Sequence, residues 1–385
     1  MQPRDENQKK KLTKAQRRRK KKVRRIVKRT GLCLLTAIAL LLVGLLWAGQ
    51  AGFRGPSRTV SDLLTVSMLE TSALKFVPRI YFSKAQVAEI VARNEIKTSD
   101  AETDTSLITI PAPTPEATEP PAVQPGEMTE EERLFASAST PEPVVTPAPE
   151  NLLLSEDGID VFEVRGGTYM GYMMVVYDPS RVTCGTCRDS FTSAKGLQLK
   201  DIAKRYNALA AINGGGFEDA GGSGNGGQPI GLVISEGKVK HTGSTSGDFY
   251  ATVGFDKDNI MHIGRISASQ AQKYGIRDAM TFGPKLIVNG EAASVKGQSS
   301  GLNPRTAIGQ RSDGAVLMLV IDGRQASSLG ATYADLITVM MEYGAVNAIN
   351  LDGGSSSLMY YKGDYLNKGV TLTGSRNMPT AFIVR

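Results

Sequence analysis

A stretch of 23 residues without a charged side chain, Gly31–Phe53, constrains this chain of 385 residues more than any other feature. It follows a basic segment, because residues 1–30 contain 15 Lys/Arg and two acidic residues. About 20 apolar residues suffice for a helix to cross a bilayer, and flanking Lys/Arg residues stay in the cytoplasm. The sequence therefore predicts a cytoplasmic tail at 1–30, one transmembrane helix at 31–53 and a C-terminal part outside the cell membrane.

A cleaved signal peptide is the alternative, since Gly49-Gln50-Ala51 could serve as a cleavage site. The apolar stretch is longer than a usual signal-peptide core and lies behind a long basic segment, which favours an uncleaved anchor. The chain's net charge of +7 is uneven, with +13 in residues 1–30 and −6 in the remainder. Residues 1–53 are thus expected to contact membrane lipid, and the mildly acidic remainder argues against nucleic-acid binding.

Residues 54–96 have helical patterning, and residues 97–150 do not. Ser83 and Gln86 have the spacing of a capping box at the start of a short helix. Ten of the chain's 18 prolines fall between Pro111 and Pro149, among Thr, Ala and Glu. Such a composition buries too little apolar surface to become ordered. We expect a helical stalk at 54–96 and a disordered linker at 97–150 that holds the next domain on the order of 100 Å from the membrane.

Residues 151–385 have the size of one domain and combine strands with helices. The apolar patterns predict strands and helices at 172–177, 199–206, 208–212, 316–321, 346–352 and 381–384. Thr332 and Asp335 suit the cap of a further helix, which lies between the strands at 316–321 and 346–352. This order is typical of a βαβ unit with parallel strands. The predicted fold class is α+β, a mixed α/β sheet domain with βαβ units.

Three of the predicted strands end in a polar side chain followed by glycine: Asn213-Gly214, Asp322-Gly323 and Asp352-Gly353. Each pair alone is typical of a turn. Because carboxyl ends of strands line the ligand crevice in sheets with parallel strands, the three together indicate a shared site. Strand alternation places Asn350 on the same face as Asp352. The glycines and hydroxyls of Gly353-Gly354-Ser355-Ser356 suit an oxyanion or a phosphate.

Several cations are candidates for binding an anion. Arg305, just before an apolar strand, could clamp a phosphate or form a surface ion pair, and Lys285 and Arg376 are further candidates. The glycine-dense loop at 218–227 suits a lid or a weak calcium site, but its spacing differs from that of an EF-hand. No cofactor is therefore predicted, and a divalent metal is left without support. No histidine has a plausible serine partner, which argues against a histidine-dependent hydrolase.

Cys184-Gly185-Thr186-Cys187 is a Cys-x-x-Cys motif in the part of the chain expected outside the cell. A redox centre would place this motif where a strand meets a helix, and a zinc site would need further ligands. We expect instead a local disulfide between Cys184 and Cys187 that staples a loop.

Motifs in the second half of the chain, in this order, resemble the phosphodiester glycosidase family. They are Asn213-Gly214-Gly215-Gly216-Phe217, Gly283-Pro284, Asn303-Pro304-Arg305-Thr306-Ala307-Ile308-Gly309, Ile321-Asp322-Gly323-Arg324, Asn350-Leu351-Asp352-Gly353-Gly354-Ser355-Ser356-Ser357 and Pro379-Thr380-Ala381-Phe382. The resemblance covers roughly residues 199–385. It implies cleavage of a sugar-1-phosphodiester of the GlcNAc-1-phosphate type into free sugar and a phosphomonoester, in cell-surface polysaccharide metabolism.

The implied chemistry needs a carboxylate at the anomeric carbon and cations for the leaving phosphate. Asp352 is our first choice for the carboxylate, Asp322 the second and Glu218 the third. Arg305 and Arg376 are our choices for the phosphate. Asn213 and Asn350 are expected to bind sugar hydroxyls. The backbone amides of Gly353, Gly354, Ser355 and Ser356 are expected to assist at the phosphate, and Gly214 and Gly215 are further substrate-binding candidates.

Two other functions remain open from the sequence. The first is a tethered module that binds surface glycopolymers without catalysis. The second is a metal-dependent phosphodiesterase that breaks the P–O bond instead of the C–O bond.

Overall fold

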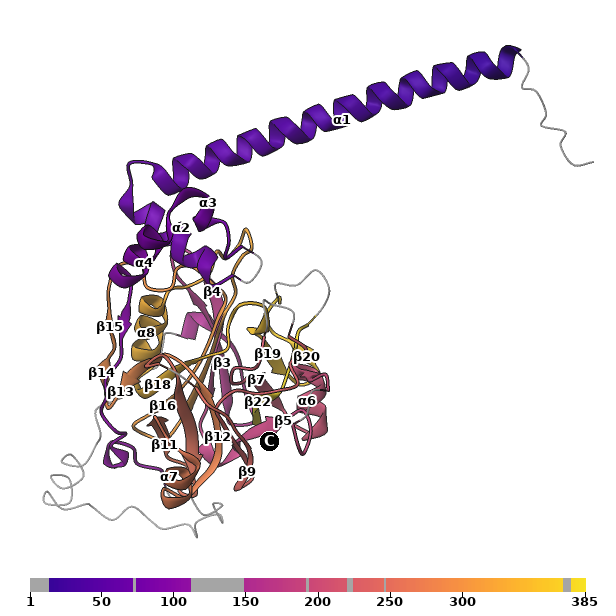
Figure 1. Cartoon of the computed structure of the whole chain (residues 1–385). Helices are drawn as coiled ribbons and strands as arrows, with labels where there is room; N and C mark the ends of the chain where they lie inside the picture. Colours follow the sequence, from indigo (N-terminus) through magenta and orange to yellow (C-terminus); the bar gives the residue numbers. More distant parts are fainter. Residues whose placement is uncertain are drawn as a thin grey trace, which may run out of the picture. The chain divides into compact units, whose positions relative to one another are not determined.

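The computed structural model describes residues 14–71, 74–111, 149–191, 194–219, 224–245, 247–369 and 375–385. The chain divides into two compact units, Met1–Ser61 and Asp62–Arg385. In the first unit, the predicted apolar helix is present as α1 (Lys14–Arg54). Within the described residues it is the one helix long and apolar enough to cross a membrane, and a signal sequence near an N-terminus would share these properties (Figure 1).

The second unit is built mainly from three antiparallel sheets. The largest has the order β14 (Glu291–Ala292), β13 (Lys285–Val288), β18 (Ala345–Leu351), β16 (Arg305–Arg311), β17 (Val316–Ile321), β4 (Met170–Val176), β3 (Ile159–Arg165) and β2 (Leu152–Glu156). The second has the order β11 (Met261–Gly264), β10 (Ala251–Asp256), β12 (Ile276–Phe282), β8 (Leu232–Ser235) and β9 (Lys238–Thr242). The third has the order β20 (Asp364–Tyr365), β19 (Met359–Tyr361), β7 (Ala210–Asn213), β22 (Thr380–Val384) and β5 (Val182–Thr186).

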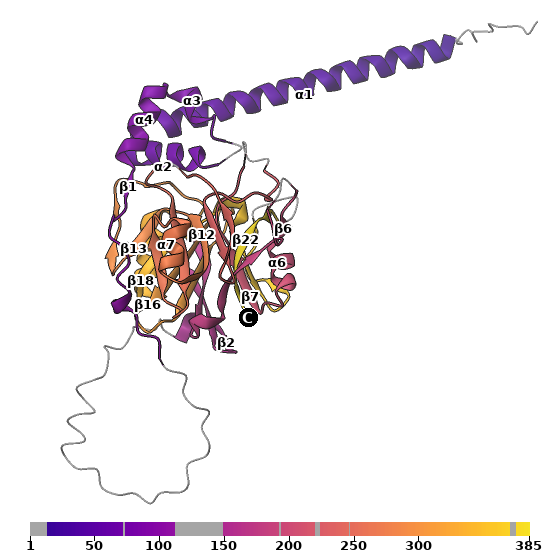
Figure 2. The ribbon, with the colours of Figure 1, turned by 60° about the horizontal axis from the view of Figure 1, so that its bottom comes forward.

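One hydrophobic core lies between the three sheets, with side chains such as Met174, Phe255 and Phe382 fully buried in it. The outer face of each sheet is covered by a helix. The largest sheet packs on α8 (Tyr333–Glu342), the second on α7 (Ala268–Lys273) and the third on α6 (Leu199–Arg205). Figure 1 shows α8 and α6 on different sides of the strands, and Figure 2 brings α7 to the front.

Residues 62–111 belong to the same compact unit as the three sheets. They contain most of α2 (Arg58–Leu69), α3 (Pro78–Tyr81) and α4 (Lys84–Arg93), and α4 begins with the predicted Ser83–Gln86 capping box. Next, β1 (Ile96–Lys97) pairs with β15 (Ser294–Val295). The hydroxyl of Thr103 donates to the carbonyl of Ile263 at 3.2 Å, and the N–H of Thr109 donates to the carbonyl of Ser312 at 2.8 Å.

These contacts differ from the expected stalk and spacer. Residues 62–111 precede the proline-rich segment, and residues 149–385 follow it, yet both are parts of one unit. Most of the predicted linker, residues 112–148, lies outside the described residues. The first part of the predicted linker, residues 97–111, therefore belongs to the unit that contains the sheets.

The predicted strand–helix–strand unit is present as β17, α8 and β18, and Thr332 and Asp335 form a capping box at α8. Its two strands run parallel, but they are not adjacent. Strand β16 lies between them and pairs antiparallel with both. Every strand pairing between described residues is antiparallel. A short pair completes the fold, β6 (Leu197–Gln198) with β21 (Asn377–Met378).

The predicted disulfide is absent, because Cys184 and Cys187 are free thiols. Both are buried, but they belong to different hydrophobic clusters. Cys184 lies on strand β5 and faces the central core, whereas Cys187, three residues later, packs in the cluster that contains α6. An odd spacing along extended chain sends the two side chains to opposite faces, so they cannot bond without moving the backbone. Burial also raises the pKa of the Cys184 thiol well above its usual value.

Candidate active site

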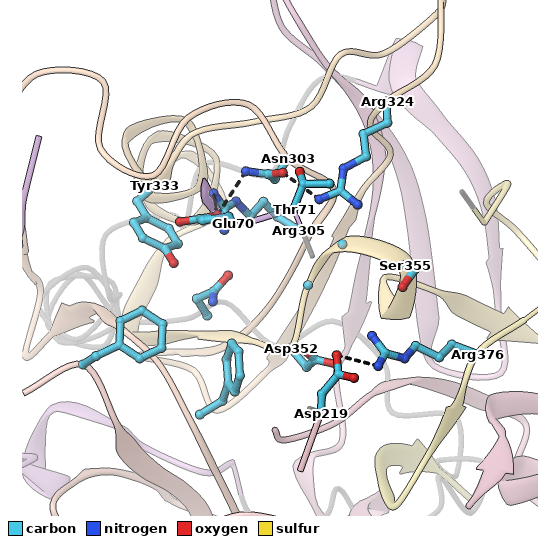
Figure 3. A pocket seen from close by; sticks show the side chains of 15 residues that line it. Glu70, Thr71, Asp219, Asn303, Arg305, Arg324, Tyr333, Asp352, Ser355 and Arg376 are labelled. Carbon is cyan, nitrogen blue, oxygen red and sulfur yellow. Dashed lines mark hydrogen bonds and ion pairs between the residues drawn. The ribbon is translucent and has the colours of Figure 1, made fainter. Parts of the chain in front are cut away.

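A cavity of about 520 Å³ opens beside the end of β18 and contains an unusual number of charged side chains. Three carboxylates and three arginines line it: Glu70, Asp219, Asp352, Arg305, Arg324 and Arg376. Its other lining residues are polar or aromatic: Thr71, Phe249, Phe282, Asn303, Tyr333, Asn350, Gly353, Gly354 and Ser355. Figure 3 shows Glu70, Asn303 and Arg305 together at one side, and Asp219, Asp352 and Arg376 at the other.

The sheet order explains why Arg305 and Asp352 share this cavity. Strand β16 begins at Arg305 and runs antiparallel between β17 and β18. Its first residues therefore pair with the last residues of both neighbours, Arg305 with Ile321 and Thr306 with Leu351. The cation at the start of one strand thus meets the carboxylate that follows the end of another.

Asp352 is held by its neighbours in an environment that favours its neutral form. Its N–H donates to the carbonyl of Gly214 at 3.2 Å, and its carbonyl accepts from Asn213 Nδ2 at 2.6 Å. Burial raises the pKa of Asp352 to about 6, against opposing contributions from Ser356 and Arg376, which stabilise the charged carboxylate. A carboxylate with such a pKa can act as a base or nucleophile near neutral pH.

Arg305 is a buried cation with a carboxylate partner from the N-terminal helical segment. Only 5% of its side chain is exposed, and its Nη2 lies 2.9 Å from Glu70 Oε2. The guanidinium also donates to the carbonyls of Ala331 and Ser300, and it stacks over the Tyr333 ring at 4.4 Å. Burial raises the pKa of Glu70, although Arg305 stabilises its charged form. These contacts hold the Arg305 side chain in place, and Glu70 neutralises its charge.

Arg376, at the other side of the cavity, is also paired with a carboxylate. Its Nη2 lies 2.6 Å from Asp219 Oδ2, and its guanidinium stacks over the ring of Phe217 at 4.7 Å. The ion pair with Arg376 lowers the pKa of Asp219, which outweighs the effect of burial. Asp219 also accepts from the N–H of Gly224 at 2.7 Å.

Asn350 presents an acceptor at the cavity wall. Its Nδ2 donates to the carbonyl of Gly283 at 2.6 Å, while its Oδ1 is buried and has no hydrogen-bond partner among the residues that the structure describes. Because an unsatisfied buried acceptor is costly, a ligand hydroxyl that donates to it would gain binding energy.

Several residues expected in the site lie outside the cavity lining. Asn213 is 1% exposed and accepts from the Thr306 hydroxyl at 2.7 Å and from the Leu358 N–H at 3.1 Å, so it supports the backbone at Asp352. Gly214 and Gly215 bond to Thr380 through their N–H groups.

The two alternative catalytic carboxylates also lie elsewhere. Asp322 is buried and accepts from Asn367 Nδ2 at 2.8 Å, and burial raises its pKa. Glu218 is exposed, and its neighbour Asp219 lines the cavity instead. The expected binding of an anion by backbone amides is also restricted, because Gly354 N–H donates to Pro304 and Ser356 N–H to Gly353.

Some charged residues of the cavity were not predicted from the sequence, and two of them come from segments that the predicted site did not include. Glu70 directly follows α2, and Asp219 comes from a loop whose next described residue is Gly224. Arg324 stands in one of the family motifs, so that motif could have pointed to it. Lys285, in contrast, is turned away from this cavity, since its Nζ bonds the carbonyl of Ser99.

No group of three or more His, Cys, Asp or Glu side chains suited to a metal ion occurs in the part of the chain that the structure describes. The glycine-dense loop considered for calcium includes residues 220–223, which lie outside that part. His262 pairs with Asp256 at 2.8 Å and stacks on Tyr274 at a centroid distance of 5.4 Å, away from the cavity.

Comparisons with known proteins agree with the motifs. A family model described as phosphodiester glycosidase matches residues 206–385. The SPbeta prophage-derived uncharacterized protein YomE of Bacillus subtilis (strain 168) is 32% identical over 174 residues, 43% of this chain and 26% of that protein. The chain thus spans about a quarter of the length of this curated relative.

Two solved structures are similar at lower identity. One is the zebrafish N-acetylglucosamine-1-phosphodiester alpha-N-acetylglucosaminidase catalytic domain auto-inhibited by pro-peptide, 23% identical over 62% of this chain and 85% of that chain, with a TM-score of 0.48. The other is a hypothetical protein from Synechocystis, 16% identical over 60% and 62% of the two chains, with a TM-score of 0.43. The family model and the motifs thus agree that residues 206–385 of this α+β chain are similar to the phosphodiester glycosidase family.

Proposed function

We propose that this protein is a glycosidase that hydrolyses a sugar-1-phosphodiester to the free sugar and a phosphomonoester. The observation that carries the proposal is that Asp352, whose pKa is raised to about 6, shares one cavity with three arginines. The cavity volume of about 520 Å³ is typical of small-molecule sites. The description of the matching family supports the same reaction.

The proposed chemistry needs a carboxylate that acts at the sugar and a cation that stabilises the leaving phosphate. The Asp352 carboxylate acts at the anomeric carbon, as nucleophile or as base for a water molecule. Arginine stabilises the phosphate as the C–O bond breaks, and because phosphate is a good leaving group, a strong general acid is less necessary. Asn350 Oδ1 accepts from a sugar hydroxyl, and the rings of Phe249 and Phe282 offer apolar surface to the sugar.

We also propose that α1 tethers the enzyme as a single-pass anchor, with its basic end in the cytoplasm and the domain outside the cell. The support is the length and apolar composition of α1 together with the cluster of Lys/Arg at its start. In that setting the substrate is a GlcNAc-1-phosphodiester or another glycopolymer of the cell surface.

Hydrolysis in ¹⁸O-labelled water tests the reaction. The full chain in detergent is the appropriate sample, because residues 62–111 form one unit with residues 149–385. With a panel of sugar-1-phosphodiesters, C–O cleavage is expected to place the label on the sugar. Label on the phosphate, or loss of activity in EDTA, would point to a metal-dependent phosphodiesterase. Absence of turnover across the panel would favour a module that only binds glycopolymers.

Two variants test the assignment of the carboxylate. We expect Asp352→Asn to lower kcat by about 10³-fold or more, as loss of a nucleophile or base does. Glu218→Gln is the matched control, since Glu218 is exposed and lies outside the cavity lining, and it should retain wild-type kcat. Full activity of Asp352→Asn would refute the assignment.

A further inference from the structure

The three arginines of the cavity differ in how their charge is balanced. Arg305 is paired with Glu70 at 2.9 Å, and Arg376 is paired with Asp219 at 2.6 Å. An incoming phosphate would have to compete with a carboxylate already in place at either guanidinium, and separating such a pair leaves a charge without its partner. Neither arginine is therefore an open position for an anion.

Arg324 has no carboxylate within ion-pair distance in the described ranges. Its Nη2 donates to Asn303 Oδ1 at 2.9 Å, and the amide of Asn303 in turn donates to Glu70 Oε2 at 3.0 Å. One hydrogen bond thus orients the guanidinium, while a guanidinium carries five N–H donors in all. Burial and the positive charge of Arg305 lower the pKa of Arg324, while Glu70 opposes this shift, and a guanidinium remains protonated in proteins.

The backbone places this guanidinium next to the proposed catalytic carboxylate. A Cβ atom built on Gly354 would lie 3.6 Å from both Nη atoms of Arg324, so the guanidinium lies over the backbone two residues after Asp352. Arg324 itself has φ of +55°, a left-handed conformation that is uncommon for a residue with a side chain and that concentrates at functional sites. Gly323 packs so closely on Pro304 that a Cβ atom would lie 2.6 Å from its nitrogen. The strand end is therefore held in a defined position.

We propose that Arg324 is the residue that binds the phosphate of the substrate, with Asn303 as its positioning residue. Glu70 and Asp219 then have the complementary task of neutralising the other two arginines, which leaves one open cation beside the anomeric carbon held at Asp352. This assignment rests on the proposed function for the identity of the ligand, and it replaces Arg305 and Arg376 as the phosphate-binding groups.

The test measures binding of inorganic phosphate to the full chain in detergent by calorimetry, together with competitive inhibition by phosphate in the turnover assay. We expect Arg324→Gln to weaken phosphate binding 10- to 100-fold, because charge-assisted hydrogen bonds to a bidentate group are lost. Arg324→Lys keeps the positive charge but lacks the planar guanidinium, so its phosphate affinity should lie between those of the wild type and Arg324→Gln. Arg376→Gln should lose less phosphate affinity, and Arg165→Gln, which changes an exposed side chain at the end of β3, should lose none.

Unchanged phosphate affinity in a folded Arg324→Gln variant, or absence of phosphate binding to the wild type, would overturn the assignment. A larger loss in Arg376→Gln than in Arg324→Gln would overturn it as well. Thermal unfolding of each variant confirms that the comparison is made between folded proteins. Binding of phosphate does not require turnover. A wild type that binds phosphate through Arg324 but cleaves no sugar phosphodiester would refute the proposed function, while Arg324 would still be the phosphate-binding residue of the cavity.

Discussion

At the scale of single residues, Asp352 links activity to stability. Its pKa of about 6 lies above the ordinary value of 3.8, so the folded state favours the protonated carboxyl, and ionisation at neutral pH costs stability. We predict that Asp352→Asn raises the free energy of unfolding by about 1–3 kcal/mol at pH 7 and that this gain disappears towards pH 4. Denaturant unfolding at several pH values measures this difference. A gain in stability that persists at pH 4 would contradict the assigned cause.

The same pKa predicts how the activity of the wild type depends on pH. Because the ionised carboxylate is the reactive form, kcat/KM should rise with pH and level off above about 6, which kinetics at several pH values would measure.

Strand alternation and the family motifs pointed to part of the cavity lining. Asp352, Asn350 and Arg305 could be predicted as site residues because strand alternation and the family motifs surround them, and the structure places all three at one cavity. Asn213 and Asp322 have the same local pattern, a polar residue before glycine, but they bond inward to other parts of the chain. A pattern along one strand fixes the direction of a side chain and leaves open which segment meets it.

At the scale of elements, the hydrophobic period predicts several strands and helices, but it does not predict which strands lie next to one another in a sheet. The predicted β17, α8 and β18 are present, with the expected capping box. The insertion of β16 between β17 and β18 depends on long-range pairing that the hydrophobic period of each segment does not encode. That insertion is what brings Arg305 to the cavity.

Glu70, the residue that follows helix α2, contributes directly to the cavity, and a substitution there should reveal this. Glu70→Ala removes the carboxylate partner of the buried Arg305 and one acceptor of Asn303. We predict a loss of about 1–3 kcal/mol in the free energy of unfolding, measured by denaturant titration. Glu89→Ala, which removes an exposed carboxylate from the same segment, is the control and should change stability by less than about 0.5 kcal/mol. Equal effects of the two substitutions would show that Glu70 does not support Arg305.

At the scale of the whole molecule, composition alone suggested an anchor, a spacer and a separate head. The apolar helix is present, but residues 62–111 form one unit with the sheets through contacts such as Asn94 Oδ1 with the N–H of Gln298 at 2.6 Å. Proline content identifies a segment that cannot build a core of its own. It does not reveal that the polypeptide before that segment returns to the same domain as the polypeptide after it.

The position of the proline-rich segment has a consequence for shedding from the cell surface. A protease that cuts a spacer between anchor and head releases the head, whereas a cut within residues 112–148 leaves both chain ends bound in one unit. We predict that a site-specific protease, with its recognition sequence inserted in this segment, yields two fragments on a denaturing gel that sediment together with membranes. Activity should also persist, since Glu70 remains at the cavity. Recovery of the C-terminal fragment in the soluble fraction would show that residues 62–111 do not retain it.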